Sequence, residues 1–335
     1  MDCPSVLELL RVIVVVFGLR LVNCTDSVFS DSEWNPYCWG FECCNEEWIV
    51  RDINELLSKL TSELFGQHLV HDVVFAAIKG HIDHQSEKPL VLSFHGTTGT
   101  GKNHVSQLIA KSWFLKGMES KFVHVYSGTK DFPYRSDQDI KRYKNRLQTE
   151  IKRETKNCKY SIFIFDEIDS FPAGLLNSIR SYLEHYPMVD GVDYRNTIFI
   201  LLSNTGGNTL KDITFDFYRR GRDRKDIKLG ETEKEMVIEV FNDKDTGFSR
   251  SRLIDTHLIS HYIPFLPLER DHVRWCIRNE MIRRSMNPTQ VDVIDEVLDE
   301  LQFHGIDQMF SVKGCKNVAE KLSYVVTKRW MRDEL

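Results

Sequence analysis

Residues 96 to 103 read Gly96-Thr97-Thr98-Gly99-Thr100-Gly101-Lys102-Asn103. This stretch follows the pattern G-x-x-x-x-G-K-[ST] except at its last position, which is asparagine. Glycines at these positions let the backbone wrap closely around a phosphate, so that its N–H groups and the start of a following helix face the negative charge. All eight residues are therefore candidates for binding ATP, and Lys102 is expected to reach the β- and γ-phosphates.

A second motif supplies two carboxylates. Four apolar residues, 162–165, are followed by Asp166 and Glu167. In nucleoside triphosphatases one acid of this kind holds Mg²⁺ and another residue orients the attacking water. We expect Asp166 to hold Mg²⁺ and Glu167 to polarise the water. The carboxamide oxygen of Asn103 is expected to join Asp166 at the metal, directly or through water.

A third apolar run, 198–202, leads into Ser203 and Asn204. An asparagine at the tip of a strand beside the Asp166 strand can hydrogen-bond the γ-phosphate or the attacking water, which would make Asn204 part of the catalytic centre. It can equally be a turn residue before Thr205-Gly206-Gly207. Both interpretations stay open at the level of the sequence.

The pattern of apolar residues predicts the fold class. Strand-length apolar runs at 90–94, 162–165 and 198–202 alternate with polar, helix-compatible segments such as 140–154, and one helical face is apolar over 53–64. This indicates an α/β domain with a parallel sheet covered on both faces, over residues 51–266. The tail, 267–335, is expected to be a small helical domain with helices at 268–284, 291–303 and 316–330 and no strand.

The composition is that of a folded globular chain. The 335 residues are 41 % hydrophobic and 28 % charged, which excludes disordered, collagen-like and polytopic membrane proteins. The formal net charge is −5, which argues against a surface built to hold nucleic acid, and we expect no nucleic-acid partner.

The two ends of the chain point to the secretory pathway. The hydrophobic run at 12–22 is shorter than the roughly 20 residues of a membrane-spanning helix and is typical of a signal peptide over 1–24. A buried strand or a membrane anchor that does not cross is the alternative. Residues 332–335 read Arg-Asp-Glu-Leu, one residue away from the endoplasmic reticulum retention signal. We therefore expect a lumenal protein in which disulfides persist, with a cysteine-rich lead-in over 25–50.

Four segments together resemble the torsin family, the lumenal branch of the Clp-like AAA+ ATPases. They are residues 65–69 (Phe-Gly-Gln-His-Leu), 99–103, 161–167 and 314–316 (Gly-Cys-Lys). The resemblance runs from about Tyr37 to the final helix. It implies an AAA+ fold, with a three-layer P-loop domain around a parallel sheet, a small C-terminal helical lid, and nucleotide bound between subunits.

The same resemblance implies roles for residues in the lid. Lys316 would be the sensor 2 residue, which brings a cation from the lid to the γ-phosphate. Cys276 and Cys315 match a cysteine pair whose disulfide links redox state to nucleotide binding, and two buried thiols are the alternative. Cys38 and Cys158 match a second family disulfide.

Dependence on a partner is also implied. A Clp-type ATPase carries an arginine finger just before the strand that closes its large domain, and here Leu258 stands in its place. A missing finger costs about 10³–10⁵ in rate in other nucleoside triphosphatases. Torsins obtain the arginine from lumenal domains of lamina-associated polypeptide-type membrane proteins, and we expect the same partner here. A homo-oligomer and a peripheral membrane association remain open.

One basic run, Arg219-Arg220-Gly221-Arg222-Asp223-Arg224, is unusual for the family. It is interpreted as a solvated face. An arginine that acts in cis, or a contact with an acidic partner, is the alternative.

The leading hypothesis is thus a partner-activated, chaperone-like ATPase of the endoplasmic reticulum lumen and the perinuclear space of the nuclear envelope, which uses ATP and Mg²⁺ to remodel proteins or membranes. The alternative is a non-hydrolysing, nucleotide-gated scaffold or holdase, suggested by Asn103 and Leu258. A helicase-like ATPase, suggested by Asp166-Glu167-Ile168-Asp169, is disfavoured by the acidic charge.

Overall fold

The computed structural model describes residues 38, 40–84, 86–242, 247–248 and 257–333. They belong to two units, residues up to Asn45 and Glu46–Leu335, and each is described by itself. The signal segment at 1–24 and the last two residues of the Arg-Asp-Glu-Leu ending lie outside the described residues. In the first unit Cys38 forms a disulfide with Cys43, with the Cα atoms 5.5 Å apart, so the expected pairing of Cys38 with Cys158 is wrong. The two cysteines are close in sequence, and this short loop satisfies the geometry that a disulfide requires.

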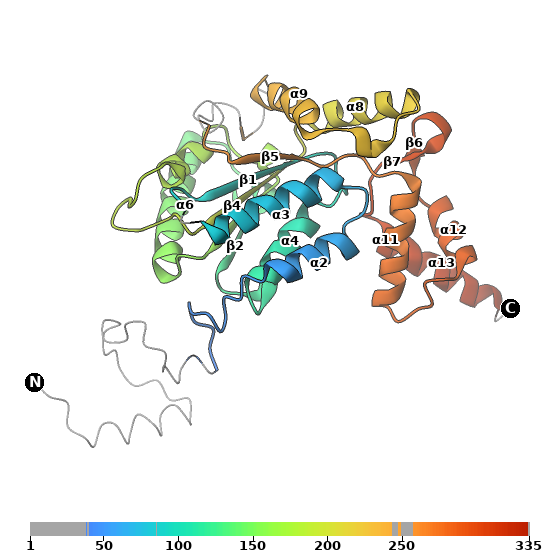
Figure 1. The fold of residues 1–335 in the computed structure, drawn as a ribbon, viewed down its shortest axis with the longest axis horizontal. Coiled ribbons are helices and arrows are strands. Elements are labelled where there is room, and N and C mark those ends of the chain that lie inside the picture. Colours follow the sequence, from blue (N-terminus) through green and yellow to red (C-terminus); the bar gives the residue numbers. More distant parts are fainter. Residues whose placement is uncertain (1–37, 39, 85, 243–246, 249–256, 334–335) are drawn as a thin grey trace, which may run out of the picture. The chain divides into compact units, whose positions relative to one another are not determined.

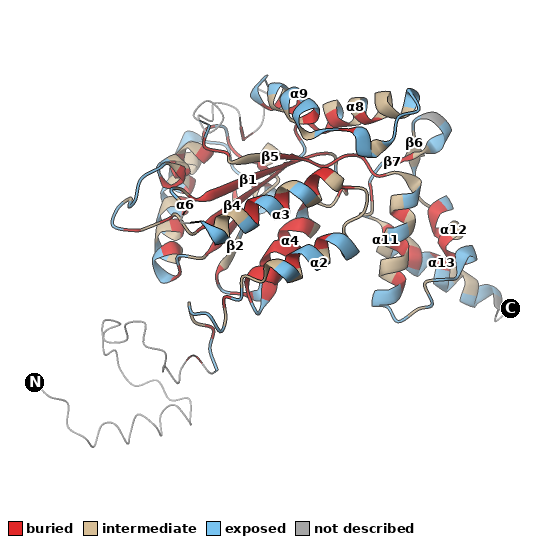
Figure 2. Cartoon of the chain, viewed as in Figure 1, coloured by how far each residue is buried: buried red, intermediate tan, exposed pale blue. Residues whose placement is uncertain are grey.

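The second unit is built on a five-stranded parallel sheet in the order β2-β3-β4-β1-β5. The strands are β1 (Leu90–His95), β2 (Val123–Ser127), β3 (Ile162–Asp166), β4 (Ile198–Ser203) and β5 (His261–Pro264). The three apolar runs are confirmed as β1, β3 and β4, which occupy the middle of the sheet and are almost fully buried (Figure 2). The edge strand β2 has no such run, because its residues are only partly buried and alternate with polar ones.

Helices cover both faces of this sheet (Figure 1). The long helices of this part are α2 (Ile53–Glu63), α3 (His68–Asp83), α4 (Lys102–Trp113), α6 (Asp137–Asn157), α8 (Gly207–Arg219) and α9 (Leu229–Asn242). The side chains of Phe163, Phe165 and Phe199 pack on one face with α6, α8 and α9. Helix α4 packs on the other face, against β3 and β4. This is the predicted three-layer α/β arrangement, and shorter helical segments join these elements.

The small domain contains the three predicted helices, α11 (Arg270–Arg283), α12 (Val291–Asp299) and α13 (Val318–Asp333). They pack around a core of their own that includes Ile277, Leu298 and Leu322. The expectation of no strand is wrong, because β6 (Phe303–His304) pairs antiparallel with β7 (Phe310–Ser311). Each strand has only two residues, too few to leave an alternating pattern in the sequence. Within the described ranges, no helix combines the length and the apolar character that crossing a membrane would need.

Candidate nucleotide site

The loop that connects β1 to α4 requires its glycines. Gly99 and Gly101 have φ angles of 76° and 110°, which side chains rarely adopt. A Cβ atom on Gly96 would lie 2.4 Å from the carbonyl oxygen of Phe265, and one on Gly99 would lie 1.8 Å from that of Lys313. Gly101 is the N-cap of α4, so the loop leads directly into the helix N-terminus, as the motif predicts.

The ammonium group of Lys102 is buried inside this loop. Its Nζ donates to the carbonyl oxygens of Gly96 at 2.6 Å and Thr97 at 2.9 Å and to Oδ1 of Asn204 at 3.1 Å. Burial lowers the pKa of Lys102 to about 8, although the carboxylates of Asp169 and Asp166 act in the opposite direction. Its three hydrogen-bond acceptors are neutral oxygens, and a phosphate bound in the loop would bring a negative charge into direct contact with this cation.

Asp166, at the end of β3, lies next to Asn103, the second residue of α4. Nδ2 of Asn103 donates to Oδ2 of Asp166 at 2.7 Å. The two predicted metal ligands are therefore neighbours, and carboxylate and carboxamide oxygens are the donors that Mg²⁺ accepts. The side chains present thus fit a magnesium site.

Glu167 has a left-handed backbone conformation, with φ 56° and ψ 47°, which turns its side chain toward the end of β2. Its Oε2 accepts from Oγ1 of Thr129 at 2.5 Å and from Oγ of Ser127 at 3.1 Å. The hydrogen bond from Thr129, supported by Ser127 and by the charge of Lys316, lowers the pKa of Glu167. The two hydroxyl residues were not recognised in the sequence, because β2 carries no motif.

Asn204 lies at the end of β4, and its side chain contacts Lys102. Its amide is also held by Asp169, which belongs to the short helical segment η3 (Ile168–Ser170) after β3. Asp169 was not proposed as a site residue, although it is the last acid of the Asp166-Glu167-Ile168-Asp169 stretch. The sequence signal that could have identified Asp169 is its spacing, because it follows Asp166 by about one helical turn.

A cavity of about 440 Å³ unites most of the predicted residues. Those that line it are Thr98, Gly99, Gly101, Lys102, Asn103, Asp166, Glu167, Asn204, Cys315 and Lys316. Gly96 and Thr97 contact the cavity's Lys102 through their carbonyl groups. Thr100 is buried behind the loop. The ends of β3 and β4, the phosphate loop and the lid thus meet at one site.

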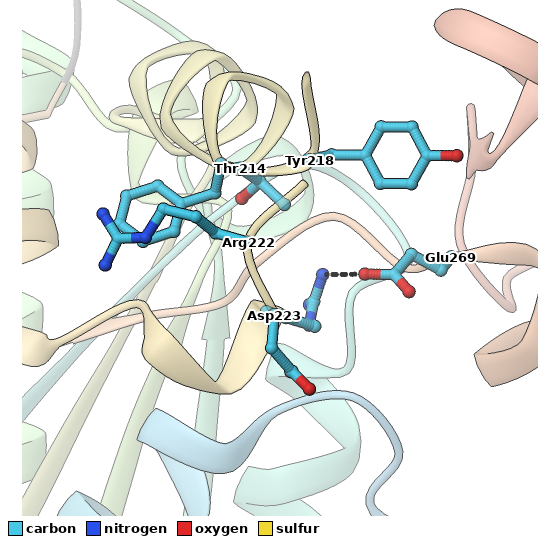
Figure 3. A pocket seen from close by; sticks show the side chains of 7 residues that line it. Thr214, Tyr218, Arg222, Asp223 and Glu269 are labelled. Atoms are coloured by element: carbon cyan, nitrogen blue, oxygen red, sulfur yellow. Dashed lines mark hydrogen bonds and ion pairs between the residues drawn. The ribbon is translucent and has the colours of Figure 1, made fainter. Parts of the chain in front are cut away.

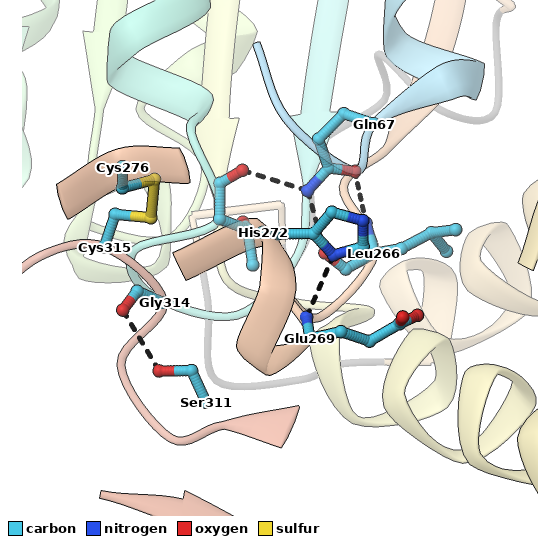
Figure 4. The surroundings of a disulfide bond; sticks show 9 residues. Gln67, Leu266, Glu269, His272, Cys276, Ser311, Gly314 and Cys315 are labelled. Carbon is cyan, nitrogen blue, oxygen red and sulfur yellow. Dashed lines mark hydrogen bonds between the residues drawn. A yellow bond between two sulfur atoms is a disulfide. The ribbon is translucent and has the colours of Figure 1, made fainter. Parts of the chain in front are cut away.

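The lid reaches this site through residues 313–316. The backbone N–H of Cys315 donates to the carbonyl oxygen of Gly99 at 3.1 Å. Cys315 is also bonded to Cys276 of α11, so a disulfide anchors the loop that carries Lys316 (Figure 4). The expected pairing is present, and its alternative of two thiols is not what the structure contains. Its effect on nucleotide binding stays a prediction.

Gln67 connects the phosphate loop with the segment after β5. Its Nε2 donates to the carbonyl oxygens of Thr100 at 3.0 Å and Leu266 at 2.8 Å, and its Oε1 accepts from the N–H of Leu266 at 2.9 Å (Figure 4). Leu266 directly precedes the chain segment that enters the lid. Gln67 therefore links the phosphate loop to the start of the lid connection.

The basic run divides into two parts. Arg219 and Arg220 are exposed and pair with Asp216, as a solvated face predicts. The side chain of Arg224 is instead only 9 % exposed, and it donates to the carbonyl oxygens of Gly66 at 2.8 Å and Pro267 at 2.7 Å and to Glu269 at 3.2 Å.

Arg224 lines a separate cavity of about 250 Å³ together with its ion-pair partner Glu269, which is labelled in Figure 3. Burial lowers the pKa of Arg224 to about 10. It is not among the residues that line the nucleotide cavity. Arg224 therefore connects the large domain to the lid, and the solvated-face interpretation is wrong for this residue.

Comparisons with known proteins show which family this sequence matches. The family model described as Torsin matches residues 38–165, and the one described as Torsin-1A, C-terminal domain, matches residues 268–325. A "Torsin-like protein" of Caenorhabditis elegans is 41 % identical over 295 residues, which cover 87 % of this chain and 82 % of the relative. A "Torsin-like protein" of Drosophila melanogaster is 35 % identical over 298 residues, which cover 87 % of each chain.

Solved structures agree with the fold. A Saccharomyces cerevisiae Hsp104–ADP complex superposes with a TM-score of 0.59 at 15 % identity, and covers 84 % of this chain. Hsp104 in a closed state with ATPγS and FITC casein superposes with a TM-score of 0.58 at 15 % identity. This chain spans about half the length, 48 %, of those Hsp104 chains. The likeness confirms the predicted AAA+ fold with its helical lid.

Proposed function

The chain belongs to the torsin family, and from this membership and the geometry of its nucleotide site we propose that it is a partner-activated AAA+ ATPase. The observation that carries the proposal is the single cavity in which Lys102, Asp166, Asn204 and Lys316 meet. These side chains offer two cations for phosphates, a carboxylate for a metal, and a carboxamide beside the phosphate position.

ATP would occupy this cavity with its phosphates in the loop 96–103. Asp166 and Asn103, which are hydrogen-bonded neighbours, would hold Mg²⁺, and the ion would supply positive charge for the phosphates. Lys102 would bind phosphate oxygens, and Lys316 would add a second cation from the lid. Once the Glu167 carboxylate is released from Ser127 and Thr129, it would accept a hydrogen bond from the attacking water.

The need for a partner is supported by two observations. Leu258, at the position of the arginine finger, is buried in the hydrophobic core, so its side chain cannot reach a neighbouring subunit. Within the described part of the chain, no residue that lines the nucleotide cavity is an arginine. A lumenal domain of the lamina-associated polypeptide type would supply this cation and increase the rate by about 10³–10⁵.

We place the protein in the lumen of the endoplasmic reticulum and in the perinuclear space of the nuclear envelope, where it would remodel proteins or membranes as a chaperone-like ATPase. The Arg-Asp-Glu-Leu ending and the hydrophobic N-terminus support this location. The disulfides Cys38–Cys43 and Cys276–Cys315 fit an oxidising compartment.

The second candidate is a nucleotide-gated holdase that does not hydrolyse ATP. The engagement of Glu167 by Ser127 and Thr129 favours it, because the two hydroxyls occupy a carboxylate oxygen that would otherwise accept from the attacking water. Glu167→Gln separates the two functions. An ATPase is trapped by this change in a long-lived ATP-bound complex with its partner, whereas the lifetime of a holdase complex stays the same.

The deciding experiment is ATP hydrolysis by the lumenal chain, alone and with the lumenal domain of the partner. The control is the same partner domain with its arginine replaced by alanine. We expect negligible turnover alone and stimulation only by the intact partner. Equal and robust turnover in all three mixtures would contradict the proposal. Repeating the assay in reducing buffer tests whether Cys276–Cys315 regulates the site.

A further inference from the structure

Asp169 gathers the end of β4 into one hydrogen-bond network. Its Oδ1 accepts from Oγ of Ser203 at 2.5 Å and from Oγ1 and the N–H of Thr205 at 2.8 and 3.3 Å. Its Oδ2 accepts from the N–H of Asn204 at 2.7 Å and from the Asn204 Nδ2 at 3.0 Å. Five donors converge on the two carboxylate oxygens, more than the roughly four lone pairs that these oxygens offer, so no acceptor site of this side chain is left free.

Asp169 is ionised in this network. Burial by itself would raise its pKa, but the hydrogen bonds from Ser203, Asn204 and Thr205 outweigh burial and hold the pKa below its ordinary value. An ionised carboxylate accepts hydrogen bonds and donates none. Asp169 therefore presents only acceptors to Asn204.

The carboxamide of Asn204 has only one orientation that satisfies its neighbours. Its Nδ2 donates to Asp169, and its Oδ1 accepts from the ammonium of Lys102 at 3.1 Å. Rotating the amide by 180° would place the oxygen against the carboxylate and the NH₂ group against the ammonium, and both contacts would be repulsive. The two charged neighbours thus define which end of the amide faces the phosphate loop.

We infer that Asp169 is a positioning residue that directs the oxygen of Asn204 into the nucleotide site, so that Asn204 acts there as a hydrogen-bond acceptor. This inference rests on the proposed function and refines it. A γ-phosphate oxygen is itself an acceptor and cannot pair with the Asn204 oxygen, and the second N–H of Nδ2 belongs to the end of the amide that is turned toward Asp169. The partners that remain for it are the ammonium of Lys102 and an O–H group of the attacking water.

Nucleotide affinity tests the orientation of Asn204 directly. Fluorescent ATP and ADP analogues are titrated with Mg²⁺ into the wild-type chain and Asn204→Ala. An acceptor has no bond to the γ-phosphate, so the ratio of ATP to ADP affinity stays the same within about twofold, while partner-stimulated kcat falls about 100-fold because the water is misplaced. If Asn204→Ala weakened ATP binding by fivefold or more relative to ADP binding, Asn204 would be a donor to the γ-phosphate, and the inference would be overturned.

The role of Asp169 is tested by a double-mutant cycle. Asp169→Ala is expected to lower kcat about as much as Asn204→Ala, and the double variant no further, because both changes remove one function. Additive losses would mean that Asp169 acts independently of Asn204 and would overturn the inference.

Asp169→Asn is the conservative variant. It keeps an oxygen for the two N–H groups of Asn204, while the hydroxyls of Ser203 and Thr205 can turn to accept from its NH₂ group. The N–H of Thr205 loses its 3.3 Å bond to the carboxylate but keeps the one to Oγ of Ser203 at 3.0 Å. It should retain kcat within about threefold, and thermal melting checks that each variant folds. Loss of kcat in a folded Asp169→Asn chain, to the level of Asn204→Ala, would also contradict the inference.

The control for removal of a carboxylate is Asp193→Asn. Asp193 is partly exposed and pairs with Arg195, and it does not line the nucleotide cavity. It should change neither affinity nor kcat. If the wild-type chain binds neither ATP nor ADP, the proposed function itself is wrong. If it binds both and the variants behave otherwise than stated, only the role of Asp169 is wrong.

Discussion

The N–H of Cys315 donates a hydrogen bond to the carbonyl oxygen of Gly99, so the lid and the phosphate loop are in direct backbone contact. The two backbones can approach closely because each has a glycine at the contact, Gly99 in the phosphate loop and Gly314 in the lid. A Cβ atom on Gly314 would lie 2.1 Å from the Gly99 oxygen. The lid position and the shape of the phosphate loop are therefore coupled without any ligand between them.

Gly314→Ala should separate these two loops. Gly314 has φ 53°, so alanine there meets both backbone strain and a collision with Gly99. We expect the free energy of unfolding to fall by about 1–3 kcal/mol from overpacking, in addition to the strain. ATP affinity should fall about tenfold, because Lys316 moves away with its loop. Denaturant titration and nucleotide binding measure the two effects.

Gly221→Ala is the matched control for this change. Gly221 has φ 64° and nothing within 4 Å of its added Cβ, so it meets the strain without the collision. If the two variants lose the same stability and both bind ATP normally, the contact between the loops has no energetic role.

Thr129→Val should release Glu167. The hydrogen bond from Thr129 is the main reason that the pKa of Glu167 is lowered, so its loss brings that pKa back toward the ordinary value. A hydrogen bond to a charged group contributes about 1.5 kcal/mol, so partner-stimulated hydrolysis should rise about tenfold as the carboxylate becomes free for the water. Thr129→Ser keeps the hydroxyl and should leave the rate as it is. A slower Thr129→Val enzyme would mean that Thr129 supports Glu167 in its active position.

Arg224→Met should destabilise the junction between the large domain and the lid. It removes a buried cation from Glu269 and from the carbonyl groups of Gly66 and Pro267, and breaking a buried pair costs about 3–5 kcal/mol. Arg220→Met breaks an exposed pair with Asp216 and should change the free energy of unfolding by less than about 1 kcal/mol. Urea titration compares them. Equal effects of the two changes would remove the distinction between a structural and a solvated arginine.

Lys102 gives the nucleotide-free protein a specific pH dependence. The pKa of Lys102 is about 8 in the folded chain and 10.5 in the unfolded chain. Between pH 8 and 10.5 the unfolded chain therefore binds more protons than the folded chain, and the free energy of unfolding rises with pH. Burial of the charged ammonium lowers the free energy of unfolding by about 3 kcal/mol at most; this loss is complete below pH 8 and disappears above pH 10.5. The difference in unfolding free energy between the wild-type chain and Lys102→Met should therefore change over this range. A difference that is constant with pH would contradict the lowered pKa.

Local sequence was sufficient for the central strands and the phosphate loop. The runs at 90–94, 162–165 and 198–202 are buried on both faces, so they are apolar at every position except Ser93. The motif residues that follow them stand at strand ends by their position in the chain. Loop geometry at Gly99 and Gly101 likewise depends on the residues of the loop itself. These features could be predicted because each depends on only a few consecutive residues.

The remaining features depend on partners that are distant in the chain. Three contacts join segments that meet only after the sheet and lid have folded. They are the hydrogen bond from Thr129 to Glu167, the one from Asn204 to Asp169, and the one from Arg224 to the carbonyl oxygen of Gly66. A hydroxyl, a carboxylate or an arginine looks the same in the sequence whether it faces water or a buried partner. Only the tertiary structure decides that, because the desolvation and the hydrogen-bond partners of each group come from its spatial neighbours.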